Sequence, residues 1–253
     1  MCAGSIISPK LLISAYHCTY NKKDGTEKPC DHSDGKRLAV LGRHKIEGRK
    51  TKSYFGIPII DVKYPPNQRI SSRNFKSHDL AILVLKDPIV YSSKIRPICL
   101  PTKDEEFYGR SVTTVGWGRT GAPKVNKKQS PVLKWLQLKV SEKRYKHKKM
   151  FGTELNKVQK KYQDPCSGDS GDIGGKVHSK KFIPGGPLMH LSDATNRFTL
   201  IGTAFGGGYN CITDKVDKFE GSDDGIWNMV SAHVDWIENI KREFNTKCMD
   251  SET

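Results

Sequence analysis

The chain contains seven short runs of β-prone residues, and turn-forming residues separate them. Gly, Pro, Asn and Asp lie between successive runs. The runs cover residues 5–14, 37–41, 54–62, 80–85, 111–117, 133–140 and 198–205. Many short strands without intervening helical periodicity indicate an all-β sandwich or barrel rather than alternating strand and helix units.

Helical spacing is clearest near the end of the chain. The apolar residues that recur at this spacing are Val234, Ile237, Ile240 and Phe244. Lys241 and Arg242 follow in the last turns, where cations stabilise a helix. We therefore expect a carboxy-terminal helix over residues 232–245. Residues 143–162 are rich in Lys, Glu, Gln and Leu and favour a second short helix, although no apolar stripe accompanies them.

The length of the chain bounds its domain organisation. With 253 residues it can bury a sizeable core, and two packed barrels of about 100 residues each would still form one compact unit. The longest apolar runs, such as residues 80–85, are far shorter than a membrane-spanning helix. We therefore expect one soluble globular unit without a membrane span.

The formal net charge of +16 is large, and its excess is concentrated in one region. Between Lys124 and Lys161, thirteen Lys or Arg residues face only Glu142 and Glu154. Such a run is more often a solvated face than a binding site, and polyanion binding through Lys143–Lys161 is the functional alternative. The sequence has no zinc-finger spacing, aromatic RNA-binding signature or basic heptad segment, so we do not expect nucleic acid as a partner.

Seven cysteines are dispersed along the chain. They stand at positions 2, 18, 30, 99, 166, 211 and 248. They are too dispersed for a metal cluster and too many for a small cytosolic protein, so we expect an oxidising, extracellular compartment. The amino terminus lacks the features of a secretory signal, so export is encoded elsewhere or not at all. No sequence feature requires a metal, a nucleotide or another cofactor.

Three separated segments supply an imidazole, a carboxylate and a hydroxyl, in that order. His17 lies in Ser-Ala-Tyr-His-Cys, Asp79 in Ser-His-Asp-Leu-Ala-Ile-Leu, and Ser170 in Asp-Pro-Cys-Ser-Gly-Asp-Ser-Gly. Serine is a poor nucleophile at neutral pH, so it needs a base to take its proton and an acid to orient that base. Each segment alone is weak evidence, but the joint order and context are specific.

With these segments the chain resembles the trypsin and chymotrypsin family, whose hallmarks are Ala-Ala-His-Cys, Asp-Ile-Ala-Leu and Gly-Asp-Ser-Gly-Gly-Pro. The likeness extends from Cys2 to about Ile237. Lesser matches are Arg-Pro-Ile-Cys-Leu-Pro at 96–101, Gly-Trp-Gly at 116–118 and Gly-Ile-Trp at 225–227. The resemblance therefore rests on a series of motifs that spans most of the chain.

The resemblance implies two six-stranded Greek-key β-barrels, the first of them incomplete, and a carboxy-terminal α-helix. Residues 1–101 would form the truncated first barrel and residues 102–231 the second, within a single peptidase domain over residues 1–253. The implied activity is that of a serine endopeptidase, which cleaves after Lys or Arg through an acyl-enzyme intermediate. The alternative is a catalytically inactive homologue that acts as a binding or regulatory module.

The resemblance also assigns residues to the substrate site. The backbone N–H groups of Gly168 and Ser170 would form the oxyanion hole. Asp164 would lie at the base of the primary specificity pocket, where its carboxylate requires a cation from the substrate. Further substrate-binding positions are Ala204, Phe205, Gly206 and Gly225. The family usually has Ser, whose hydroxyl supports the triad Asp, in place of Ala204, and Trp in place of Phe205.

Two disulfides are implied by the resemblance. One joins Cys2 to Cys18 and braces the catalytic histidine, and the other joins Cys166 to Cys211 beside the substrate pocket. Cys99 resembles the cysteine that often tethers a protease domain to an upstream light chain. The cysteines without an assignment are Cys30 and Cys248.

Two departures from the family pattern bear on activity. The chain begins at the equivalent of the first disulfide cysteine, so the family's new amino terminus, which would pair with Asp169, is expected to be missing. Without it the oxyanion hole would remain malformed, as in zymogens. In addition, Gly171 is followed by an insert of fourteen residues, 172–185, before Gly-Pro-Leu resumes. The insert is either an outward specificity loop or a retained intron.

Overall fold

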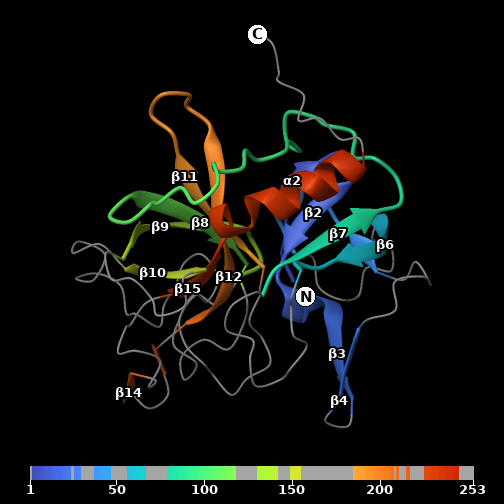
Figure 1. Ribbon diagram of the computed structural model, residues 1–253, viewed down its shortest axis with the longest axis horizontal. Helices are drawn as coiled ribbons and strands as arrows, with labels where there is room; N and C mark the ends of the chain where they lie inside the picture. Colours follow the sequence, from blue (N-terminus) through green and yellow to red (C-terminus); the bar gives the residue numbers. More distant parts are fainter. Residues whose placement is uncertain are drawn as a thin grey trace.

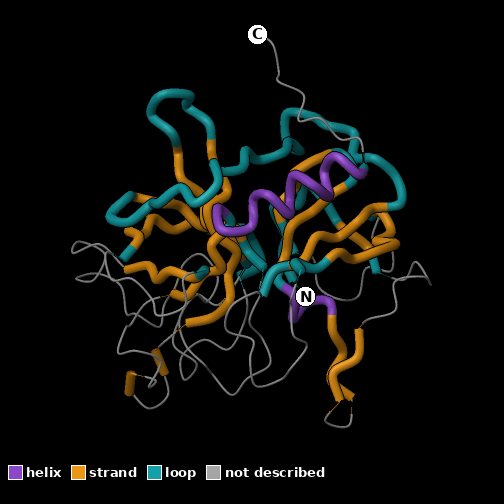
Figure 2. Tube along the Cα trace, in the orientation of Figure 1, coloured by secondary structure: helices purple, strands orange, loops and turns teal. Residues whose placement is uncertain are grey.

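The computed structural model describes most of the two halves of the chain and the helix that follows them (Figure 1). The described residues are 2–23, 26–29, 37–46, 56–66, 79–117, 130–141, 149–154, 185–207, 209–210, 215–216 and 225–244. Strands dominate both halves, as Figure 2 shows. No helix in these ranges is long and apolar enough to cross a membrane.

The first half forms a five-stranded antiparallel sheet. In spatial order its strands are β1 (Ser5–Ser8), β2 (Leu11–Ser14), β7 (Ala81–Leu85), β6 (Ile57–Lys63) and β5 (Leu38–Ala39). The run predicted over 5–14 is a hairpin, because a turn at Pro9 and Lys10 divides it into β1 and β2. Among the described strands the sheet stays open between β1 and β5, and a cavity of about 830 Å³ is lined from both.

The second half forms a closed six-stranded barrel. Around the barrel the strands are β8 (Ser111–Gly116), β9 (Lys134–Val140), β10 (Met150–Glu154), β15 (Gly225–Met229), β12 (Phe198–Gly207) and β11 (Pro187–Leu191). Strand β9 shows the period of two that a half-buried strand requires, because Leu136, Leu138 and Val140 are buried and alternate with exposed residues. These side chains pack around the fully buried Trp227.

Short elements connect and flank the two halves. They are η1 (Tyr16–Thr19), β3 (Tyr20–Lys23) paired with β4 (Thr26–Pro29), β13 (Tyr209–Asn210) paired with β14 (Lys215–Val216), and η2 (Ser231–His233) before α2 (Val234–Glu243). An all-β fold with an incomplete first barrel, a closed second barrel and a carboxy-terminal helix confirms the predicted fold class.

Helix α2 returns from the second barrel to cover the first sheet (Figure 1). Ile237 is buried against Leu11 and Leu80 in a cluster that belongs mainly to β1, β2 and β7. At the end of the helix, Lys63 of β6 lies 3.7 Å from the Glu243 carboxylate. Lys63 also donates a hydrogen bond to the Asp61 carboxylate, and this bond is the main cause that raises the pKa of Lys63 above its ordinary value. Lys63 is therefore charged at neutral pH, and the contact with Glu243 persists.

Two predictions about helices need correction. The carboxy-terminal α-helix begins at Val234 and ends at Glu243, and a 3-10 turn occupies 231–233. The second helix suggested over 143–162 is wrong where that range is described, because 150–154 form β10. This strand pairs with β15 on one side and β9 on the other, and that pairing closes the barrel. Tertiary hydrogen bonding has therefore overridden local helix propensity.

Candidate active site

His17 lies in a tight turn that follows directly on β2. The turn is the 3-10 helix η1, in which the Cys18 N–H donates to the Ala15 carbonyl at 3.1 Å and the Thr19 hydroxyl donates to the Tyr16 carbonyl at 2.7 Å. Both neighbours of His17 in the turn are thereby fixed. The imidazole itself keeps 32% of its side-chain surface exposed, so a substrate can reach it.

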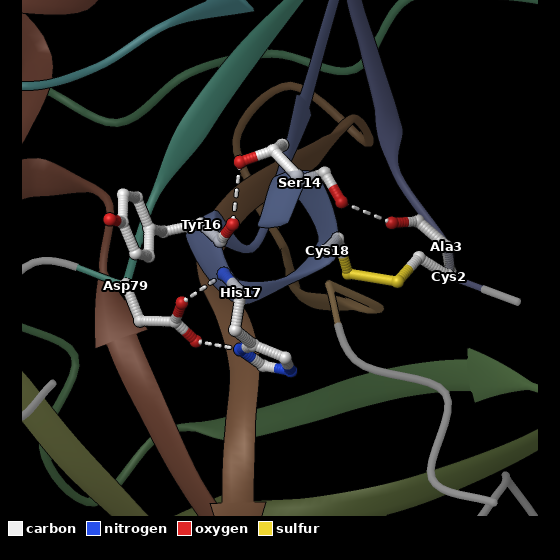
Figure 3. Close-up of a disulfide and its surroundings, with 8 residues drawn as sticks. Cys2, Ala3, Ser14, Tyr16, His17, Cys18 and Asp79 are labelled. Atoms are coloured by element: carbon white, nitrogen blue, oxygen red, sulfur yellow. Dashed lines mark hydrogen bonds and ion pairs between the residues drawn. A yellow bond between two sulfur atoms is a disulfide. The ribbon is translucent and has the colours of Figure 1, made fainter. Parts of the chain in front are cut away.

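Asp79 is held against this imidazole from the start of β7 (Figure 3). The residue is 1% exposed. One carboxylate oxygen, Oδ2, lies 2.6 Å from His17 Nδ1, and the other, Oδ1, accepts the His17 backbone N–H at 2.8 Å. An ionised carboxylate only accepts hydrogen bonds, so Nδ1 carries the proton. The Nε2 lone pair is then available to accept a proton from another group.

The backbone of Asp79 is bound by a residue that the sequence analysis missed. Asn228 Oδ1 accepts the Asp79 N–H at 3.2 Å, and Asn228 Nδ2 donates to the Asp79 carbonyl at 3.0 Å. Asn228 is fully buried in β15. The only sequence signal was one Asn inside the apolar segment Gly-Ile-Trp-Asn-Met-Val, a polar residue in a strand that is otherwise suited to the core.

A disulfide links the turn that carries His17 to the segment before β1. Cys2 and Cys18 are bonded, and the Ser14 hydroxyl donates to the Ala3 carbonyl at 2.6 Å (Figure 3). The two connections tie the segment before β1 to both ends of the turn. The structure thus contains the disulfide that the resemblance implied beside His17.

Removing this disulfide is expected to lower the free energy of unfolding by about 3 kcal/mol, because the bridge closes a loop of sequence separation 16. The variant is Cys2→Ser with Cys18→Ser, and urea unfolding measures the change. Cys99→Ser is the control, since Cys99 is a free cysteine in the described chain. A loss below about 1 kcal/mol in the double variant would show that the bridge adds little to the fold.

The four predicted substrate-binding residues that are described lie on two paired strands. Ala204, Phe205 and Gly206 belong to β12, and Gly225 begins β15. The register pairs Ala204 with Trp227 and Gly207 with Gly225. These residues therefore share one wall of the second barrel.

The segment at the end of the predicted insert packs against both the barrel and the His17 turn. The Gly185 N–H donates to the Ala204 carbonyl at 3.2 Å, and the Ala204 N–H donates to the Gly186 carbonyl at 2.8 Å. A side chain at Gly185 would meet Ser14 and the backbone of Ala3. Gly185, the last residue of the predicted insert, is thus packed against the barrel and the His17 turn.

The remaining predicted site residues lie outside the described part of the chain. They are Asp164, Cys166, Gly168, Asp169, Ser170 and Cys211, together with 172–184 of the insert, Cys30 and Cys248. Within the described ranges, the arrangement supplies an oriented imidazole with a buried carboxylate behind it. Such a pair has the chemistry that a general base in a nucleophilic mechanism requires.

Comparisons with known proteins agree with this geometry. A sequence model of the trypsin family matches residues 1–223. Clotting factor G beta subunit from Tachypleus tridentatus is 24% identical, over 95% of this chain and 71% of its own length. CLIP domain-containing serine protease B10 from Anopheles gambiae is 28% identical, over 95% of this chain and 62% of its own length. Melanization protease 1 from Drosophila melanogaster is 27% identical, over 95% of this chain and 58% of its own length.

The chain spans between 58% and 71% of the length of these three relatives. The match to the family model covers most of this chain, including the first sheet, five of the six barrel strands and the turn that carries His17. The chain therefore belongs to the trypsin family of serine proteases.

Proposed function

We propose that this chain is a serine endopeptidase that hydrolyses peptide bonds after Lys or Arg through a Ser-His-Asp triad. The observation that carries the proposal is the buried Asp79 carboxylate, whose two oxygens both face His17 and hold its Nε2 ready as a base. Ser170, in the Gly-Asp-Ser-Gly segment, is the proposed nucleophile. Membership of the trypsin family supports the same assignment.

In the proposed mechanism, Ser170 Oγ attacks the scissile carbonyl carbon while His17 Nε2 takes the hydroxyl proton. The imidazolium is stabilised by Asp79 through the Nδ1 hydrogen bond, and the negative charge on the carbonyl oxygen is received by the N–H groups of Gly168 and Ser170. The C–N bond breaks as His17 returns its proton to the leaving amine. Water, deprotonated by His17, then hydrolyses the acyl-enzyme ester and releases the acid and free Ser170.

Specificity for Lys or Arg is proposed from Asp164, six residues before Ser170. A carboxylate at the base of a pocket is stabilised by a cation that reaches it from the substrate. Gly225, buried at the start of β15, together with Gly206 of β12 would leave room for a long side chain along the barrel wall.

The second candidate function is that of a catalytically inactive homologue. Two observations favour it: fourteen residues separate Ser170 from the packed Gly185, and Ala204 offers no hydroxyl to Asp79. In that case the His17–Asp79 pair would be an inherited feature of a binding module. The two candidates differ in the reactivity of Ser170.

Labelling with a fluorophosphonate probe distinguishes the candidates, because the probe reacts only with an activated serine. It is applied to this chain and to a version extended at its amino terminus, with Ser170→Ala of each as the control. We expect labelling that depends on Ser170 in the extended version. Absence of labelling in both versions would overturn the protease and favour the binding module.

The proposed setting is extracellular, which the disulfide and the named relatives support. Cys99 is half-buried and lies beside a cavity of about 700 Å³ lined by Arg96, Arg197 and Phe198. This position suits a disulfide to an upstream light chain. Polyanion binding by the Lys143–Lys161 region remains a prediction from charge, since most of that region is outside the described residues.

A further inference from the structure

We propose that Asn228 is a positioning residue of the active site, whose buried amide fixes the backbone of Asp79 and so sets the His17–Asp79 pair against the second barrel. The inference rests on the proposed function, because it assigns a role to a residue that would act through Asp79. It goes beyond that function by naming what holds the pair in place.

The contact between the two residues has two points. The Asp79 N–H donates to Asn228 Oδ1 at 3.2 Å, and Asn228 Nδ2 donates to the Asp79 carbonyl at 3.0 Å. A carboxamide has a donor and an acceptor side by side, so one side chain satisfies both backbone groups of one residue. A carboxylate would lose the donor, and an aliphatic side chain would leave both backbone groups buried and unsatisfied.

Asn228 itself is held on both sides by the closed barrel. In β15 it pairs with Met150 of β10 and with Thr203 of β12. Asn228 and Thr203 are 0% exposed, and Met150 is also buried. Close-packed neighbours leave a buried side chain little freedom. The amide that binds Asp79 is therefore fixed in the frame of the second barrel.

The proposed nucleophile belongs, in sequence, to the same half of the chain as this barrel. Strands β10 and β11 both belong to the barrel, and Ser170 lies between them in sequence. His17 instead lies in the turn after β2, and Asp79 lies just before β7, both in the first half of the fold. The link between Asp79 and β15 thus joins the His17–Asp79 pair to the second barrel.

The carboxylate of Asp79 has no second anchor in the described residues. Both of its hydrogen bonds come from His17. The position at which the family usually has a supporting serine is Ala204, which pairs with Trp227 in the barrel. The orientation of the pair therefore depends on the backbone of Asp79, and that backbone is bound by Asn228.

The test compares Asn228→Leu with Thr203→Val. Leu has nearly the shape of Asn and removes both hydrogen bonds. Thr203 is the matched control, because it is the cross-strand partner of Asn228, is equally buried, and its hydroxyl has no hydrogen-bond partner in the described structure. Two readouts are measured: the rate of fluorophosphonate labelling, and the downfield proton resonance of His17 Nδ1–H, which reports its hydrogen bond to Asp79.

We expect Asn228→Leu to label about 100-fold more slowly, since a displacement of about 1 Å in a catalytic group costs that much, and to broaden or lose the His17 resonance. Thr203→Val should keep the resonance and label within about twofold of the unmodified chain. If Asn228→Leu does not fold, Asn228→Thr, which retains one hydrogen-bonding group, should show a smaller loss of both signals.

Equal resonances and equal labelling rates in the Asn228 and Thr203 variants would overturn the positioning role. The resonance also separates this inference from the proposed function. If neither the chain nor its extended version labels, the protease proposal fails, whereas the resonance still reports whether Asn228 holds the His17–Asp79 pair.

Discussion

The variant Asp79→Asn is expected to react with a fluorophosphonate about 10⁴-fold more slowly than the unmodified extended chain. The reason lies in the direction of one hydrogen bond. Asp79 Oδ1 accepts the His17 backbone N–H, so a carboxamide at this position would keep its oxygen there and turn its NH₂ group toward Nδ1. The imidazole would then carry its proton on Nε2 and have no lone pair to accept the Ser170 proton.

Asp61→Asn is the matched control for this variant. Asp61 is an exposed acid on β6 whose carboxylate lies 3.0 Å from Lys63 Nζ, so its replacement removes the same charge far from the imidazole turn. Exposed ion pairs contribute little, and we expect unchanged labelling. Thermal unfolding of both variants shows whether the fold is retained. A folded Asp79→Asn protein that labels within tenfold of the unmodified chain would exclude the proposed role of Asp79.

The strands that the sequence predicted are those whose side chains alternate or form continuous apolar runs. Residues 80–85 and 133–140 are examples, and β7 and β9 lie within them. Strands β10 and β15 were not predicted, because Met-Phe-Gly-Thr-Glu and Gly-Ile-Trp-Asn-Met combine Gly and polar residues that disfavour a strand locally. They form because each pairs with the other, with Phe151 opposite Trp227.

In the site, too, short motifs identified some residues, whereas others could be found only from contacts between distant parts of the chain. His17 and Asp79 were identified from short motifs, and in the structure His17 Nδ1 lies 2.6 Å from Asp79 Oδ2. Asn228 was not identified, because its contact with Asp79 spans 149 residues and belongs to no short motif. The packing of Gly185 is a related case. Motif residues precede Gly171 and follow Gly185 in the sequence. Only the structure shows that Gly185 lies against the His17 turn.

That packing leads to a large expected loss of stability in Gly185→Ala. Gly185 has a φ of +81°, a conformation that L-residues rarely adopt. A Cβ there would lie 2.5 Å from the Ala3 carbonyl oxygen, 2.9 Å from the Ala15 nitrogen and still closer to the Ser14 hydroxyl. Two of these groups are backbone and cannot move away cheaply. Backbone strain and overpacking together should lower the free energy of unfolding by about 3 kcal/mol or more.

Gly186→Ala tests the same chemical change one residue later. Its Cβ would have no described neighbour closer than the Val115 carbonyl oxygen, at 3.7 Å. No loss of stability is therefore expected, and urea unfolding compares the two variants. Equal stabilities would show that Gly185 is not packed against Ser14. A large difference would mean that Gly185 is packed tightly against the His17 turn, whereas Gly186 has room for a side chain.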